Sequence, residues 1–161
     1  MADGYHFERL RDAILELSVA KQWQAAKREW NLIAVVQAEP DEPETCLCGH
    51  HPIIELCEIK NQLTSHTATV GNQCVKRFLG IETEALFRGI RRIRKDESKS
   101  MGPDLAVWLF EHNNLTQWEY DFQNSTGRKR SLTEKQLAQR QRINRKALAA
   151  VRRRGLAAAD T

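Results

Sequence analysis

Apolar residues recur every three or four positions over much of this chain, which is the spacing of a helix with one buried face. Near the N-terminus this spacing predicts one helix over residues 5–18 and a second over residues 21–37. Trp23 and Trp30 fall on the buried stripe of the second helix, and we expect them in the core because large aromatic side chains mainly bury area. The alternative is that this pair forms a platform for base stacking.

Helical spacing returns in the second half of the chain, where leucine, isoleucine and tryptophan residues mark the buried faces. Thr116 and Ser131 each stand three residues before a glutamate, which is the capping-box pattern at the start of a helix. Pro103 also favours the first turn of a helix. We therefore expect helices over residues 82–95, from Pro103 to about His112, from Thr116 onwards, and from Ser131 to about Arg154.

Between residues 46 and 78 the pattern changes to the alternation that is typical of strands. Residues 53–61 predict one strand, and residues 67–70 predict its partner after a polar turn. The run that opens at Cys74 predicts the start of a helix, which Gly80 interrupts. The chain thus divides into an N-terminal helical pair (1–38), a hairpin with a helix start (39–80), a helical region (81–127) and a basic helix with a tail (128–161).

All four cysteines lie in the hairpin segment. Cys46 and Cys48 would stand on a tight turn that Gly49 favours, because glycine adopts positive φ without strain. Cys57 would project from a strand, and a thiolate at Cys74 would gain from the positive end of a helix dipole. Knuckle, hairpin and helix start then converge as in a treble clef. We predict a mainly α fold around a small zinc-stabilised β-hairpin, with one structural Zn²⁺ bound by Cys46, Cys48, Cys57 and Cys74.

Three other interpretations of the cysteines stay open at this point. They could be buried thiols in a core, or two disulfides, although the start of the chain lacks the apolar segment of a secretion signal. An imidazole could also replace one thiolate, and His50, His51 and His66 are the candidates. The spacing C-x-C-x8-C-x16-C differs from the usual pair of C-x2-C knuckles.

The string C-x-C-G-H-x-x-I, followed by C-x-I-x-N-x-x-T and V-G-N-x-C-V-K-R-F, resembles a group of small phage- and prophage-encoded proteins with a zinc-finger-like centre. The function of that group is mostly unknown. The match is close over the cysteine segment and loose in its flanks. It implies a metal-binding protein of phage or prophage origin in the cytoplasm of a bacterial host, and it supplies no catalytic residues.

Charge is distributed unevenly along the chain. Residues 128–161 contain 11 Lys/Arg and 2 Asp/Glu, a net charge of +9, whereas residues 1–127 contain 14 and 19, a net charge of −5. A basic patch is typical of nucleic-acid binders, although an acidic neighbour within the protein could also balance it. We expect DNA or RNA to contact Lys76, Arg77, Arg91, Arg92, Arg94, Lys95, Arg128, Lys129, Arg130, Arg140, Arg142, Arg145 and Lys146.

These observations favour a non-catalytic nucleic-acid-binding protein. The first alternative is a zinc-stabilised interaction protein that binds and modulates a host protein. The second is a metal-dependent nuclease, in which His50, His51 or His66 would act with Asn61 or Asn72. No phosphate-binding glycine loop, nucleophile elbow or paired-carboxylate motif is present in the sequence. No apolar run is long enough to span a membrane, and the oligomeric state is left open.

Overall fold

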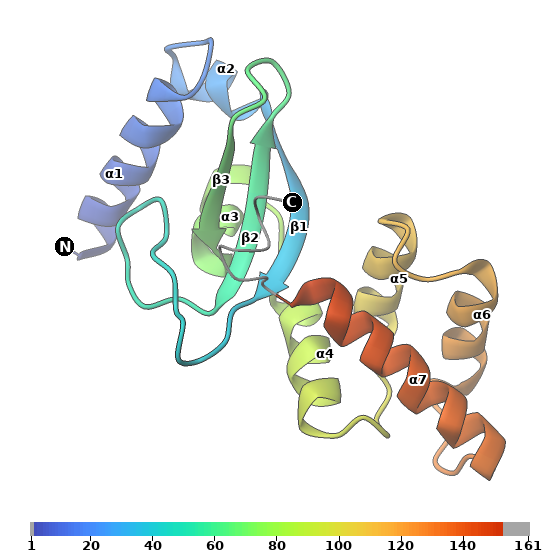
Figure 1. Ribbon diagram of the computed structural model, residues 1–161. Coiled ribbons are helices and arrows are strands. Elements are labelled where there is room, and N and C mark those ends of the chain that lie inside the picture. The colour runs from blue at the N-terminus through green and yellow to red at the C-terminus, as the bar shows by residue number, and fades with distance from the viewer. Residues whose placement is uncertain (1, 153–161) are drawn as a thin grey trace, which may run out of the picture. The chain divides into compact units, whose positions relative to one another are not determined.

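The computed structural model describes residues 2–152, and the chain divides into two compact units between Thr83 and Glu84. Helices make up about half of the chain, and the described residues contain one three-stranded antiparallel sheet (Figure 1). The expectation of a mainly helical protein with a small β-structure is therefore confirmed. The first unit carries the sheet, and the second consists of helices and loops.

The first unit is built around the predicted hairpin (Figure 1). Strands β2 and β3 pair antiparallel, with Cys57 opposite Val70. A strand that the sequence did not predict, β1, pairs with the other edge of β2. The elements of this unit are α1 (Ala2–Glu16), α2 (Trp23–Lys27), β1 (Trp30–Gln37), β2 (Glu55–Asn61), β3 (Thr67–Gly71) and α3 (Asn72–Leu79).

The helix expected over residues 21–37 is wrong for most of its length. Only α2 is helical there, and β1 begins at Trp30. The segment is rich in β-branched residues, which favour strands, and the open edge of β2 offers backbone partners that a helix would not use. The expectation that the tryptophans lie in the core is confirmed for Trp30, which is only 2% exposed. Trp23 is half-buried, and its ring contacts the buried Phe78 ring at 5.3 Å, centroid to centroid.

Helix α3 packs against the sheet and starts directly after β3 (Figure 1). Its residues Val75 and Phe78 are fully buried. Gly80 ends the helix in the left-handed conformation, with φ of 70°, a region that favours glycine. The predicted helix start around Cys74 and its interruption at Gly80 are both confirmed.

The second unit contains the four helices that the sequence predicts for residues 84–152 (Figure 1). Their buried side chains include Leu86, Ile90, Ile93, Leu105, Leu109 and Ile143. The capping box at Thr116 and Glu119 is confirmed, and Pro103 occupies the first turn of its helix. The helices are α4 (Glu84–Lys95), α5 (Pro103–Glu111), α6 (Gln117–Thr126) and α7 (Glu134–Val151).

The cap expected at Ser131 is wrong. Thr133 caps α7 instead, with a reciprocal bond from Gln136. Both pairs fit the capping-box pattern, and the helix uses the later one. The expected end of this helix near Arg154 lies outside the described residues, and α7 ends at Val151.

Candidate metal centre

Three cysteine sulfurs of the first unit lie within 4.8 Å of one another: Cys46, Cys48 and Cys74. Cys46 and Cys48 belong to the connection between β1 and β2, and both are buried. Cys74 comes from the first turn of α3. Thiolates around a tetrahedral zinc ion stand about 3.8 Å apart, as follows from a bond length of about 2.3 Å. The cluster is therefore tight enough to bind one metal ion.

The knuckle that carries Cys46 and Cys48 is held by short backbone hydrogen bonds. The Gly49 amide donates to the Cys46 carbonyl at 2.8 Å, and the Cys46 amide donates to the His50 carbonyl at 2.9 Å. Gly49 has φ of 92°, where other residues would be strained. A Cβ atom at this glycine would lie 2.6 Å from the guanidinium of Arg9. Helix α1 thus places a positive charge directly against the knuckle.

Two backbone amides point at the sulfurs. The His50 amide lies 3.5 Å from the Cys48 sulfur, and the Gly71 amide lies 3.3 Å from the Cys46 sulfur. The third sulfur sits at the N-terminal end of α3, where the helix dipole favours negative charge. Hydrogen bonds to the charged form favour it. All three sulfurs are therefore placed where thiolates are stabilised.

The thiols of the cluster compete for negative charge. A hydrogen bond from the Cys74 thiol lowers the pKa of Cys46 to about 5, and the same interaction raises the pKa of Cys74. Burial raises the pKa of Cys48. In the absence of a cation the three groups therefore cannot all ionise at neutral pH. A bound divalent cation would change this, because it binds and stabilises deprotonated thiols.

The structure does not bring Cys57 into this cluster. Its thiol donates to the hydroxyl of Thr83, with sulfur and oxygen 3.8 Å apart, and both residues are fully buried. Alternation along β2 places Cys57 on the same face as Ile59. Burial raises the pKa of Cys57 to about 12. Three of the four predicted ligands are therefore together, and the fourth thiol has another partner.

A tetrahedral ion bound by three thiolates takes a fourth ligand from another side chain or from water. The rings of His50 and His6 lie next to the knuckle, 5.7 Å apart, and Nδ1 of His6 is 3.0 Å from the carbonyl oxygen of Cys48. The other two candidates lie elsewhere, since His51 bonds the exposed hydroxyl of Thr45 and His66 is exposed after β2. Sequence reasoning missed His6 and Arg9, because nothing in the α1 pattern shows that this helix borders the knuckle.

The two asparagines proposed for a nuclease site, Asn61 and Asn72, differ in burial and in position. Asn61 is fully buried, its amide nitrogen donates to Glu29, and its oxygen accepts from the amides of Leu63 and Thr64. Its hydrogen bonds therefore have a structural role. Asn72 is the first residue of α3 and is partly exposed.

Several of the predicted nucleic-acid contacts in α7 are already paired within the second unit. Arg142 and Lys146 both bind the buried carboxylate of Glu119, at 3.1 and 2.7 Å, and Arg145 pairs with Glu97 at 2.7 Å. Burial alone would raise the pKa of Glu119, but the hydrogen bond from Lys146 and the other donors lower it to about 2. The acidic neighbours that balance these cations thus come from the same unit.

The remaining predicted contacts lie mainly on exposed surface. Arg92, Arg94 and Lys95 are exposed at the end of α4, and residues 128–130 are exposed between α6 and α7. Arg91 pairs with Glu84, and in the first unit Lys76 pairs with Glu82. Arg77 is exposed on α3, while Arg140 is buried.

Within residues 2–152, none of the helices combines the length and the apolar character needed to cross a membrane. Comparison with known proteins found no matching family model, curated protein or solved structure. The resemblance of the cysteine segment to small phage proteins therefore stays an expectation.

Proposed function

We propose that this protein is a non-catalytic nucleic-acid-binding protein, in which a structural zinc ion stabilises the first unit and the second unit contacts DNA or RNA. The observation that carries this proposal is the separation of charge between the units. Residues 84–152 contain 15 Lys/Arg and 8 Asp/Glu, a net charge of +7, whereas residues 1–83 contain 8 and 12, a net charge of −4. A compact unit with this excess of cations attracts the phosphate backbone.

Ion pairs within the second unit make some of its cations weaker candidates for contacting nucleic acid. Arg142, Arg145 and Lys146 are engaged with carboxylates, so they contribute less to binding than their number suggests. The basic triplet, Arg128, Lys129 and Arg130, is exposed and lies in a loop. Together with the end of α4, it offers the phosphate-binding groups of the unit.

The zinc assignment rests on the donor set and its surroundings. Three sulfurs that lie within 4.8 Å of one another, with amides and a helix N-terminus directed at them, fit structural zinc better than a core of neutral thiols. His50 is the candidate for the fourth ligand because its backbone belongs to the knuckle. Its ring nitrogens are not among the donor atoms that lie within 4.8 Å of one another, so the ring would have to turn toward the sulfurs to bind. The ion would then fasten the knuckle to α3, and binding it would contribute directly to folding.

The first test is fluorescence anisotropy of zinc-replete protein with labelled single-stranded DNA, duplex DNA and RNA, at low and physiological salt. We expect saturable binding that weakens steeply with salt, because counterions are released from each phosphate that is contacted. The triple variant Arg128→Ala/Lys129→Ala/Arg130→Ala should weaken it further. No binding to any of the three probes by folded protein would reject the proposal, and a search for a host protein partner would follow.

A further inference from the structure

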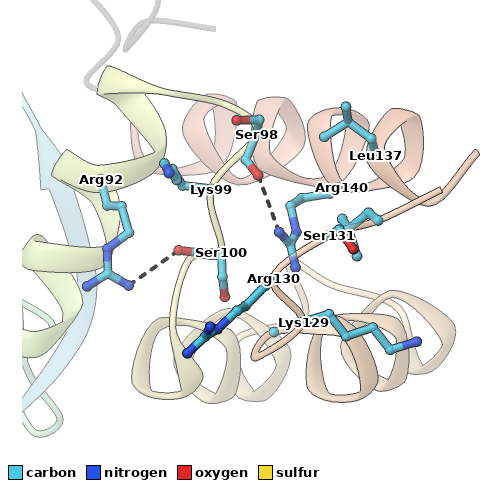
Figure 2. A pocket seen from close by; sticks show the side chains of 11 residues that line it. Arg92, Ser98, Lys99, Ser100, Lys129, Arg130, Ser131, Leu137 and Arg140 are labelled. Atoms are coloured by element: carbon cyan, nitrogen blue, oxygen red, sulfur yellow. Dashed lines mark hydrogen bonds between the residues drawn. The ribbon is translucent and has the colours of Figure 1, made fainter. Parts of the chain in front are cut away.

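The second unit has an open cavity of about 600 Å³ between the segment that follows α4 and the loop that precedes α7 (Figure 2). This volume is within the range of small-molecule sites. Basic and hydroxyl side chains from four separate stretches of the unit line the cavity, together with two leucines. The lining residues are Arg92, Ser98, Lys99, Ser100, Gly127, Lys129, Arg130, Ser131, Leu132, Leu137 and Arg140.

The cavity wall carries five cationic side chains and no acidic one. Among the acidic residues nearby in sequence, Glu97 is paired with Arg145. Asp96 accepts from the hydroxyl and the amide of Ser98, at 2.6 and 2.9 Å, and these bonds lower its pKa. These carboxylates therefore do not fill the cavity, and its cations repel one another unless an anion enters.

Arg140 is the most informative of these cations because it is only 6% exposed. Its guanidinium donates to the backbone carbonyls of Ser98 and Thr126, at 3.3 and 2.6 Å, and Figure 2 shows it reaching from α7 toward residues 98–100. Its Nε atom has no hydrogen-bond partner in the described part of the chain. A buried guanidinium is costly without an anionic partner, and the two carbonyl groups that it binds carry no net charge. An anion in the cavity would supply that charge.

The hydroxyl groups complete a donor set for phosphate oxygens. The Ser100 hydroxyl oxygen accepts from the Gln123 side-chain amide at 2.8 Å and from the Gly102 amide at 3.3 Å, so its own proton can be donated to a ligand. Gly127 allows this close arrangement, since a Cβ there would lie 2.9 Å from the Gln123 carbonyl oxygen. Serine hydroxyls beside arginine and lysine are typical phosphate contacts.

We propose that this cavity binds a phosphate group of a nucleotide, and that it is the point where the second unit holds a nucleic-acid strand. The role in holding a nucleic-acid strand rests on the proposed function, whereas the phosphate site itself does not. The volume exceeds what one phosphate needs, so the attached sugar can enter with it. The phosphate can belong to a strand or to a free nucleotide, and the experiment separates the two sources.

The test compares two double variants of the full chain that remove the same charge. Lys129→Ala/Arg130→Ala removes two cations from the cavity wall, and Arg88→Ala/Lys135→Ala removes two exposed cations of the same unit that lie outside it. Affinity is measured for a labelled single-stranded oligonucleotide, for AMP and for inorganic phosphate. The cavity variant should lose about tenfold or more for each probe that binds, and the control pair should lose much less.

The outcomes separate the cavity from the proposed function. If AMP and phosphate bind through the cavity but no oligonucleotide does, the cavity assignment stands and the proposed function fails. The phosphate that the cavity binds then belongs to a free nucleotide. If the oligonucleotide binds but both pairs of substitutions weaken it equally, the proposed function stands and the cavity assignment fails. No binding of any probe by folded wild-type protein overturns both.

A second pair of variants tests whether the loss of binding reflects the position of the charge or only the net charge of the protein. Ser131→Asp places a carboxylate on the cavity wall, whereas Ser125→Asp places one on the exposed surface of α6. Both change the net charge equally. Only Ser131→Asp should abolish binding of AMP and phosphate, and equal losses from the two substitutions would reject the cavity as the site.

Discussion

Replacing each cysteine by serine, one at a time, tests which sulfurs bind the metal. The structure predicts that Cys46→Ser, Cys48→Ser and Cys74→Ser lose zinc, because these sulfurs lie together. Cys57→Ser is the matched control and should keep it. Serine is close to cysteine in shape, and at position 57 its hydroxyl can still donate to Thr83.

The expected difference follows from the cost of ionising each thiol. Burial raises the pKa of Cys57 to about 12, so losing its proton at pH 7 costs on the order of 7 kcal/mol. An ion at the cluster would not relieve that burial, and recruiting the sulfur would leave the buried Thr83 hydroxyl without its partner. Cys46 has a pKa of about 5 and is already a thiolate at pH 7. The pKa of Cys74 is raised chiefly by Cys46, an effect that a bound cation removes.

The assay is zinc per chain by elemental analysis, followed by competition with a chelator to obtain relative affinities. Loss of a cluster thiolate should weaken zinc binding by more than about 100-fold, since even the loss of an outer-shell partner costs about 10- to 100-fold. Cobalt substitution adds a second readout, because its charge-transfer absorption reports the number of bound thiolates. If Cys57→Ser loses zinc as completely as Cys74→Ser, the centre has four thiolates and our reasoning is refuted. Wild-type protein without zinc would refute the centre itself.

Three further predictions concern single side chains. The pKa of Glu119 is lowered to about 2 in the folded state, so its carboxylate should stabilise the protein by about 3 kcal/mol above pH 4.5. This contribution should disappear as the pH falls toward 2. Glu119→Gln should therefore lower the thermal midpoint at pH 7 and reduce the change of that midpoint between pH 4.5 and pH 2. Gly89→Ala should destabilise by more than about 1 kcal/mol in denaturant unfolding, because its Cβ would lie 2.4 Å from a backbone oxygen, whereas Gly4→Ala meets nothing within 4 Å and should be nearly neutral. His50→Ala should weaken zinc binding in the chelator assay and His51→Ala should not, and equal affinities for the two would remove His50 as the fourth ligand.

Local patterns in the sequence were sufficient to predict the elements whose conformation is set by residues close in sequence. The capping box at Thr116, the proline at the start of α5 and the left-handed Gly80 at the end of α3 all follow from backbone chemistry within a few positions. The hairpin formed by β2 and β3 follows in the same way. Strand β1 could not be predicted like this, because its spacing of apolar residues also fits a helix. Pairing with β2, which is distant in sequence, decides its conformation.

The same limit applies to the candidate sites. Counting cysteines predicts a thiolate cluster, but only the fold shows that Cys57 faces Thr83 and that α1 brings His6 to the knuckle. Counting charges predicts a basic end, but not that Glu119 engages Arg142 and Lys146. The basic cavity combines a stretch that precedes α5 with one that follows α6, so no single motif in the sequence indicates it.

The position of the thiolates also indicates what a bound metal ion would do for folding. The connection between β1 and β2 runs over 17 residues, 38–54, which is long for a segment without a helix or strand of its own. The bridge between Glu44 and Ile53 joins two parts of the connection to each other. The connection is tied to β3 by the amide of Leu47, which donates to Thr69, and by the amide of Gly71, which lies 3.3 Å from the Cys46 sulfur. An ion bound by Cys46, Cys48 and Cys74 would add a tie from the middle of this connection to the start of α3.

Removal of the metal should therefore loosen the connection before it unfolds the whole protein. We expect chelation to increase amide hydrogen exchange first over residues 38–54 and at the start of α3, since regions with few ties open locally at low free energy. Helices α4 to α7 form a separate unit and should keep their protection. A uniform increase over both units would show that the ion supports the whole fold rather than this connection, and no change in exchange would mean that these cysteines do not fasten it.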